Sequence, residues 1–201
     1  MKKMLKVNLS ELIKYIAIII IILSLFSLGL KLTGYATTTD TGIINITISQ
    51  TVSINFTIDN INFGSGSVNI GSDNATINTL GNVINGNWTS VTQGFVLENI
   101  GNSNVTLHLK SGKTPAGFLG GTNPSYQYNV TNSESGSCVS GDIVLGAWNN
   151  VNTISDGDLI CSVFGFISNA NAIDIDLKLV IPSDARVGAS SDTFTATGTS
   201  I

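Results

Sequence analysis

Residues 95–113, FVLENIGNSNVTLHLKSGK, decide the fold class of this chain. They read as a strand (FVLEN), a turn (IGNSN) and a second strand (VTLHLK), with apolar and polar residues alternating in each strand. Alternation of this kind around a Gly/Asn turn predicts an antiparallel hairpin with one apolar face, and Gly101 and Asn102 form its turn. The residues expected to face the core are Phe95, Leu97, Val105, Leu107 and Leu109.

The same alternation recurs along the chain, and no segment after residue 36 has the apolar period of a helix. Further one-faced strands are expected in residues 43–48, 52–58, 125–130, 172–181 and 191–200, and residues 159–167 are apolar on both faces, as in a central strand. Glycine- and asparagine-rich turns separate these segments. Trp88 and Trp148 are interpreted as core or inter-sheet residues. The predicted fold class is all-β: a single antiparallel β-sandwich, immunoglobulin-like or jelly-roll-like, over residues 37–201.

Residues 1–36 form a separate N-terminal segment. A lysine-rich start, MKKMLKVNLSELIK, precedes the uncharged run YIAIIIIILSLFSLGL, which is the pattern of a secretory signal. Gly34 and Ala36 predict cleavage before Thr37. The alternative is an uncleaved anchor over residues 12–32, with its flanking lysines reaching the membrane surface. Both outcomes place the domain outside the cytoplasm, extracellular or at the cell surface, and the N-terminus inside.

Pilin-type processing between the basic and apolar parts is not expected. It needs a small residue after a basic one, and Tyr15 follows Lys14.

The charge of the exported part excludes one class of partner. Five of the nine basic residues and one of the thirteen acidic residues lie in the first 36 positions, so the remainder has four basic and twelve acidic residues. A net charge of about −8 repels phosphate backbones, and nucleic acid is not an expected partner.

Cys138 and Cys161 both fall in the exported part. An isolated pair outside the cytoplasm most often forms a disulfide, which would stabilise the fold by about 3 kcal/mol on the chain-entropy model. Two free thiols or an intermolecular bridge remain open alternatives.

The chain offers little for catalysis. His108 is its only histidine and falls on the polar face of its strand, without the partners that acid–base or zinc chemistry requires. The sequence SGKT at residues 111–114 resembles the end of a phosphate-binding loop, but Leu107 stands where that motif needs glycine, and Pro115 follows. We interpret it as a turn.

The acidic residues give only weak candidates. Asp156 and Asp158 could contribute to a calcium site, although the EF-hand pattern is absent. Asp174 and Asp176 alternate along one strand and are interpreted as its solvent-facing row. We expect no catalytic residues, no cofactor and no enzymatic activity.

Six Asn-x-Ser/Thr sequons in the exported part are candidate N-glycosylation sites: Asn45, Asn55, Asn74, Asn87, Asn104 and Asn129.

The phrase FVLENIGNSNVTLHLKSG resembles the L-x-N-x-G-N…V-x-L segment of secreted β-sandwich proteins of the TasA/camelysin and archaeal bundling-pilus group. The C-terminal LVIPSDARVGASSDTFTATGT is similar to the closing hairpin of many prokaryotic surface sandwich domains. The likeness covers about half of the exported chain. The cysteine pair is not part of that pattern, and the interval after Gly101 is shorter than in TasA-like proteins.

The resemblance implies assembly by strand addition at an exposed edge. The candidate donor is residues 40–48, with Ile44, Ile46 and Ile48 as the inserted row; the alternative is that this segment is the first strand of its own domain. The expected function is that of a non-enzymatic surface or extracellular structural protein, a filament or pilus subunit that associates with itself or with other surface proteins. The alternative is a membrane-anchored binding module or adhesin that recognises glycans or a partner surface.

Overall fold

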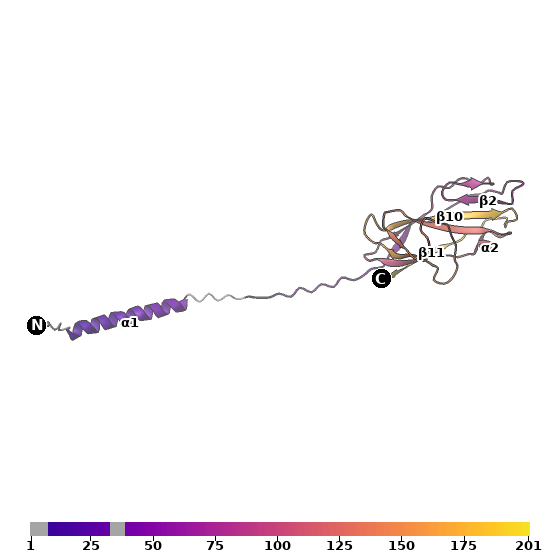
Figure 1. The fold of residues 1–201 in the computed structure, drawn as a ribbon. Helices are drawn as coiled ribbons and strands as arrows, with labels where there is room; N and C mark the ends of the chain where they lie inside the picture. Colours follow the sequence, from indigo (N-terminus) through magenta and orange to yellow (C-terminus); the bar gives the residue numbers. More distant parts are fainter. Residues whose placement is uncertain (1–7, 33–38) are drawn as a thin grey trace. The chain divides into compact units, whose positions relative to one another are not determined.

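The computed structural model describes residues 8–32 and 39–201 (Figure 1). The chain divides into two units, Met1–Thr47 and Ile48–Ile201. The first contains helix α1 (Leu9–Leu32). The second contains a one-turn helix, α2 (Pro115–Phe118), and eleven strands: β1 (Ile54–Ile58), β2 (Asn74–Asn78), β3 (Val83–Ile84), β4 (Phe95–Asn99), β5 (Val105–Ser111), β6 (Ser125–Asn132), β7 (Cys138–Ser140), β8 (Asn149–Asn150), β9 (Asp158–Phe164), β10 (Ala172–Pro182) and β11 (Phe194–Ser200).

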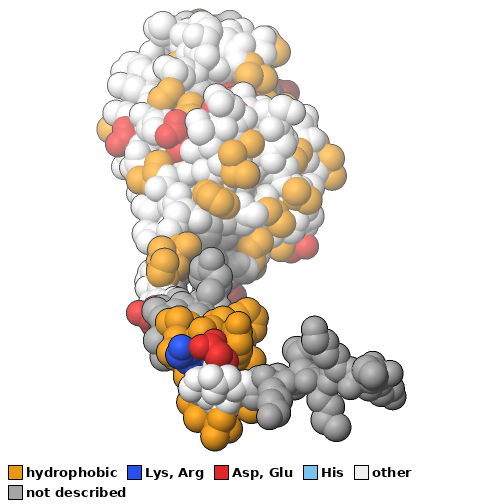
Figure 2. Space-filling model, turned by 90° about the vertical axis from the view of Figure 1, so that its left-hand side faces the viewer, with side chains coloured by type: hydrophobic (Ala, Val, Ile, Leu, Met, Phe, Trp, Pro, Cys, Tyr) orange, Lys and Arg blue, Asp and Glu red, His pale blue; other side chains and the backbone are white. Residues whose placement is uncertain are grey.

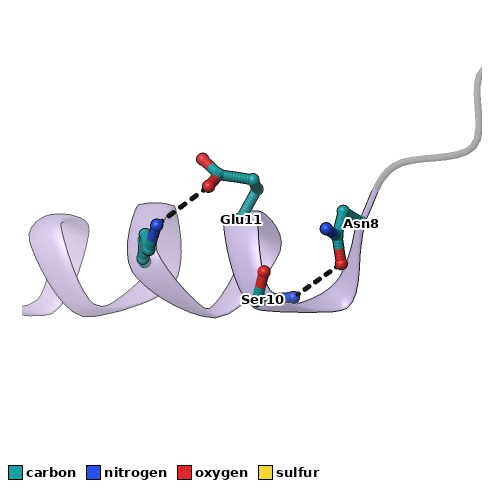
Figure 3. A network of polar contacts seen from close by, with 4 residues as sticks. Asn8, Ser10 and Glu11 are labelled. Carbon is teal, nitrogen blue, oxygen red and sulfur yellow. Dashed lines mark hydrogen bonds and ion pairs between the residues drawn. The ribbon is translucent and has the colours of Figure 1, made fainter.

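Helix α1 begins with a small polar network (Figure 3). Asn8 precedes the helix: its side-chain oxygen accepts from the Ser10 N–H at 3.4 Å, and its carbonyl accepts from the Leu12 N–H at 3.1 Å, as an N-cap residue does. Glu11 and Lys14 form an exposed ion pair at 2.9 Å. The 24 residues of α1 correspond to a length of about 36 Å.

By length and composition α1 can cross a membrane, over Leu9–Ser27 with a mean hydropathy of 2.3. A signal sequence has the same properties. Gly34, Ala36 and Thr37, at the predicted cleavage site, lie outside the described residues.

The larger sheet of the domain contains seven strands, and β10 is its central strand. One edge of β10 pairs with β6, which in turn pairs with β8. The other edge pairs with β4 over the first part of β10 and with β2 over the last part. β1 extends the sheet beyond β4, and β3 extends it beyond β2.

The smaller sheet has the order β11-β5-β9-β7, and all its pairs are antiparallel. The inward residues of the two sheets form one core, whose largest fully buried side chains include Leu97, Leu107, Tyr128, Phe164 and Ile175. The predicted all-β antiparallel sandwich preceded by an apolar helix is therefore confirmed.

The predicted hairpin over residues 95–113 is wrong in its topology. β4 lies in the larger sheet and β5 in the smaller sheet, so the IGNSN turn carries the chain from one sheet to the other. The predicted inward residues do face the core, because Leu97, Val105, Leu107 and Leu109 are at most 1% exposed. The predicted C-terminal hairpin is also wrong in its topology, because β10 and β11 lie in different sheets. Alternation fixes which side chains face inward, and that requirement is the same in a hairpin and in an arch between sheets.

Other strand predictions differ in detail. Residues 39–53 form no strand, so the reading of residues 43–48 as the first strand of the domain is wrong, and β1 starts at Ile54. Trp88 packs against the core as expected, whereas Trp148 lies under the Lys178 ammonium group, 4.7 Å from the ring centroid. Four short strands, β2, β3, β7 and β8, were not anticipated. These strands lie in polar segments that are too short to show a clear alternation of apolar and polar residues.

The sandwich has two distinguishable ends. At the end called here the near end, the chain enters the domain, and the Gln50 side chain donates to the carbonyl of Ile201 at 3.4 Å. β11 pairs with β5 from Phe194–Ser111 at the opposite, far end to Ser200–Val105 at the near end. The two ends of β11 are separated by about 20 Å, the rise of six residue steps in a strand.

Candidate functional site

A clamp of three residues from the opening motif holds the chain where it enters the domain. Asn99, at the end of β4, is fully buried. Its amide nitrogen donates to the carbonyls of Ser103 at 3.0 Å and Phe164 at 3.2 Å, and its oxygen accepts from the Gly101 N–H at 3.0 Å. Phe164 ends β9, so this side chain joins the two sheets.

The next residues of the motif bind the incoming chain. The Asn102 side-chain oxygen accepts from the Thr51 N–H at 2.6 Å, and its nitrogen donates to the Ser49 carbonyl at 3.0 Å. The backbone N–H groups of Ile100 and Asn102 donate to Ser53 and Thr51. At Gly101 an added Cβ would lie 2.4 Å from the Thr51 carbonyl oxygen, so glycine is needed for this close approach. Asn99, Gly101 and Asn102 are referred to below as the asparagine clamp.

The clamp fixes the point from which the N-terminal segment leaves the domain. Ile44, Ile46 and Ile48, the predicted donor row, are 93%, 81% and 82% exposed. They belong to no strand. A smaller hollow of about 490 Å³ lies beside the clamp, lined in part by Ile48, Phe166 and Ile201.

A second, larger hollow lies at the far end of the domain, next to β11. This groove has a volume of about 940 Å³. Its floor comes from inward residues of the larger sheet, Ile77, Leu177, Leu179 and Ile181, which are buried. Half-buried apolar side chains form its walls: Ile61, Phe63, Val68, Trp88, Phe95, Phe118, Leu119, Ala185 and Phe194.

Aromatic residues make one wall of this groove rigid. The Phe194 ring on β11 lies 5.7 Å from Phe95 and 5.8 Å from Tyr126, and Phe118 lies 5.0 Å from Tyr126, measured between ring centroids. Contacts of this kind are worth about 0.5–1.5 kcal/mol each beyond the area that they bury. The β11 side of the groove is thus a preformed aromatic surface.

The charged residues that line the groove are Arg186 and Asp192. Burial and the nearby carboxylate of Asp192 raise the pKa of the Tyr126 hydroxyl well above its usual value. One oxygen of Asp192 is buried and has no hydrogen-bond partner among the described residues. Next to Ser183 and Ala185 of the groove, the Thr122 N–H and hydroxyl each donate to Asp184 at 2.8 Å, which holds the pKa of this carboxyl below its usual range.

The groove also borders a segment with few backbone partners. Residues 59–66 follow β1 and form no backbone–backbone hydrogen bond with the rest of the described chain, up to the bridge between Val68 and Gly86. Their apolar side chains, Ile61 and Phe63, hold this segment against the domain. It therefore lacks the backbone hydrogen bonds that attach each strand of the sandwich to its neighbour.

The candidate catalytic residues do not come together. His108 is half-buried and lies between Thr197 on β11 and Leu159 on β9. SGKT is followed by the four-residue helix α2, capped by the Thr114 hydroxyl, which accepts from the Gly117 N–H at 3.1 Å. The expected plain turn is therefore a single helical turn.

The acidic candidates are engaged in hydrogen bonds. The two carboxylate oxygens of Asp158 accept from the Tyr128 hydroxyl at 2.7 Å and the Asn152 amide at 2.8 Å, while Asp156 is exposed. Asp176 was predicted to face solvent, and this prediction is wrong. The residue is only 9% exposed, and its side chain accepts a hydrogen bond from the Thr79 hydroxyl at 2.6 Å. In residues 8–32 and 39–201 there is no cluster of three or more His, Cys, Asp or Glu that could hold a metal ion.

The predicted disulfide is present. Cys138 on β7 and Cys161 on β9 are bonded, with their Cα atoms 5.3 Å apart, and both side chains are buried. The bridge fastens β7, the outermost strand of the smaller sheet, to its neighbour. An apolar N-terminal helix and a disulfide together indicate passage into an oxidising compartment.

The sequons differ in accessibility. Asn45, Asn55, Asn74 and Asn87 are exposed, and Asn104 is half-buried. Asn129 is only 7% exposed, so its amide is closed to modification in the folded domain.

The sequence pointed to the motif that forms the clamp, but it gave no sign of the groove. The donor role of residues 40–48 stays a prediction. The groove is formed by residues from five strands (β2, β4, β6, β10 and β11), from helix α2 and from the loops between them, and no local signal in the sequence marks it. No protein-family model, curated protein or solved structure matches the chain.

Proposed function

We propose that this protein is an exported, non-enzymatic structural protein of the cell surface or extracellular space, whose copies are joined by exchange of the N-terminal segment 40–48. One observation carries the proposal. A row of three isoleucines, each more than 80% exposed and part of no strand, directly precedes the folded domain in the sequence.

Solvent is an unfavourable environment for this segment. Burying an isoleucine side chain is worth about 1.5–3 kcal/mol, so the three side chains represent a substantial driving force for association. An extended segment with alternating apolar side chains suits addition to the open edge of a sheet, because the backbone supplies the hydrogen bonds and alternate side chains supply the packing. The asparagine clamp supports the proposal, since it would fix where such a joint begins.

The surface of the molecule is consistent with a structural role. On the face seen in Figure 2 the domain is mostly uncharged polar surface with scattered apolar and acidic side chains. The non-enzymatic part of the proposal is supported by the separation of the candidate catalytic residues described above. The exposed sequons Asn45, Asn55, Asn74 and Asn87 are the proposed positions for glycans in a host that attaches them.

The test is export of the full chain, N-terminal sequencing of the mature protein, and electron microscopy of the secreted material. Wild type is expected to form filaments or higher oligomers. Ile46→Asp is expected to give monomers, because the charge would have to be buried in the joint. Asn45→Asp adds the same charge to the opposite face of the segment and should assemble. Monodisperse monomers from wild type would refute the assembly function.

The second candidate is a membrane-anchored binding module, and the length of α1 favours it. Its span Leu9–Ser27 is apolar enough to remain in a membrane. This function predicts that the mature chain keeps the apolar run and stays with the membrane fraction. N-terminal sequencing separates the two candidates, because a strand tethered seven residues from the membrane has little reach.

A further inference from the structure

We propose that the far-end groove beside β11 is the site that receives residues 40–48 of a second copy, and that the incoming strand runs antiparallel to β11. This inference rests on the proposed function, since it assumes that the segment leaves its own domain. It adds the receiving surface, the direction of the strand and the polarity of the assembly.

The first argument is the open edge of β11. β11 is the outermost strand of the smaller sheet and pairs only with β5, so the backbone groups on its other side have no strand partner. The neighbouring wall of the groove is the segment 59–66, which has no backbone–backbone hydrogen bond to the rest of the described chain. An edge strand that faces a weakly attached segment can gain a new strand without breaking an existing ladder.

The second argument is chemical match. The groove is lined chiefly by aliphatic and aromatic side chains, with its charged residues, Arg186 and Asp192, in the loop before β11. The incoming segment has no charged residue between Asp40 and Asp59. Isoleucines at every second position would face the groove, while Asn45 and Thr47 would face solvent.

The third argument is geometric and determines the direction. The chain enters its own domain at the near end, held by the asparagine clamp, while the groove lies at the far end. If the near end of one copy stands over the far end of the next, its segment lies along β11 with Ile48 at the far end. Asp40 then lies past the near end of β11, outside the groove, because eight residue steps (about 26 Å) exceed the length of that strand. The segment then runs from the near to the far end of the receiving domain, whereas β11 runs from far to near. The pair is antiparallel.

The alternative within one chain has the opposite direction. A segment that folded back from the clamp along its own β11 would place Asp40 at the far end and would run parallel to β11. Every strand pair of the domain is antiparallel, and parallel pairing is slightly less stable per residue. Exchange between copies is therefore favoured, and because donor and receiver are different surfaces, the contact is head-to-tail and can propagate.

Cross-linking tests the direction. Thr195 and Thr199 both lie on β11 with exposed side chains, near the far and the near end respectively. They are separated by about 13 Å along the strand, whereas a disulfide needs Cα atoms closer than about 7 Å. Mixing secreted Thr47→Cys subunits with Thr195→Cys subunits under mild oxidation is expected to give covalent heterodimers. Mixing Thr47→Cys with Thr199→Cys should give none.

Complementation tests the site. Ala189 is exposed and lines the groove, so Ala189→Trp is expected to block reception while the subunit can still donate. Ile46→Asp should block donation only. Each variant alone should be monomeric, and an equimolar mixture should stop at heterodimers. Val139→Trp, an exposed change on β7 at the opposite edge of the smaller sheet, is the matched control and should assemble as wild type does.

The outcomes separate this inference from the function on which it rests. Wild type that never assembles refutes the proposed function. Wild type that assembles, with Ala189→Trp assembling equally well or with cross-links forming at Thr199 instead of Thr195, overturns the groove and the direction but leaves strand exchange standing. Circular dichroism of Ala189→Trp matching that of wild type shows that a failure to assemble is not a failure to fold.

Discussion

Replacing Asn99 with alanine should destabilise the domain more than any other single loss of a polar side chain in the opening motif. The side chain is 0% exposed and takes part in three hydrogen bonds, to Ser103, Phe164 and Gly101. Alanine leaves these backbone groups without their partner. Each buried group left unpaired costs about 1–3 kcal/mol.

The expected loss is about 3–5 kcal/mol, taking the carbonyls of Ser103 and Phe164 as the main unpaired groups. A domain of this size has a total stability of about 5–15 kcal/mol, so the change removes a large share of it. The corresponding fall in Tm is roughly 10 °C, at about 2–4 °C per kcal/mol.

The assay is urea denaturation of the purified protein, monitored by tryptophan fluorescence, with the slope m compared between variants. Asn150→Ala is the matched control. Asn150 is exposed and bonds only the Gln127 side chain, so the change should stay within about 0.5 kcal/mol. Asn99→Asp should be at least as harmful as alanine, because a carboxylate cannot donate to the two carbonyls and would be buried as a charge. If Asn99→Ala were as stable as Asn150→Ala, the link between the sheets would not have the role assigned to it.

Three further predictions concern the rest of the domain. Changing both Cys138 and Cys161 to serine should lower the free energy of unfolding by about 3 kcal/mol, as closure of a loop of this length predicts; an unchanged urea midpoint would contradict this. Burial and the hydrogen bond to Asp158 raise the pKa of Tyr128 well above its usual value. Below about pH 10 the Tyr128 hydroxyl is protonated in both the folded and the unfolded chain. Above that pH it loses its proton in the unfolded chain but keeps it in the folded domain, so the free energy of unfolding should fall as the pH rises. Tyr128→Phe should flatten that slope, which denaturation at pH 9 and 11 can measure. Asn102→Ala should speed hydrogen exchange at Thr51 while lowering global stability by about 1 kcal/mol or less; a loss comparable to that of Asn99→Ala would contradict it.

The apolar pattern alone was sufficient to predict the class of fold and most of the core. Period-two alternation placed Leu107, Tyr128 and Ile175 inside, and the structure buries all three. The disulfide was predicted from an isolated cysteine pair behind an apolar N-terminal segment. These features depend on local composition or on one face of a strand, and such information is present in a short window of sequence.

What only the tertiary structure decided is how the strands are shared between the two sheets. The same alternation in FVLENIGNSNVTLHLK fits a hairpin or an arch, and the choice depends on contacts with residues far along the chain, such as the bond from Asn99 to Phe164. The groove has the same origin, because its floor and walls come from segments spread between residues 60 and 194. The sequence by itself determined that the chain is a β-sandwich preceded by an apolar helix and an alternating isoleucine segment. Long-range pairing decided which strands lie at the open edges of the two sheets, β11 among them, because an edge is defined only once strands far apart in the sequence have paired.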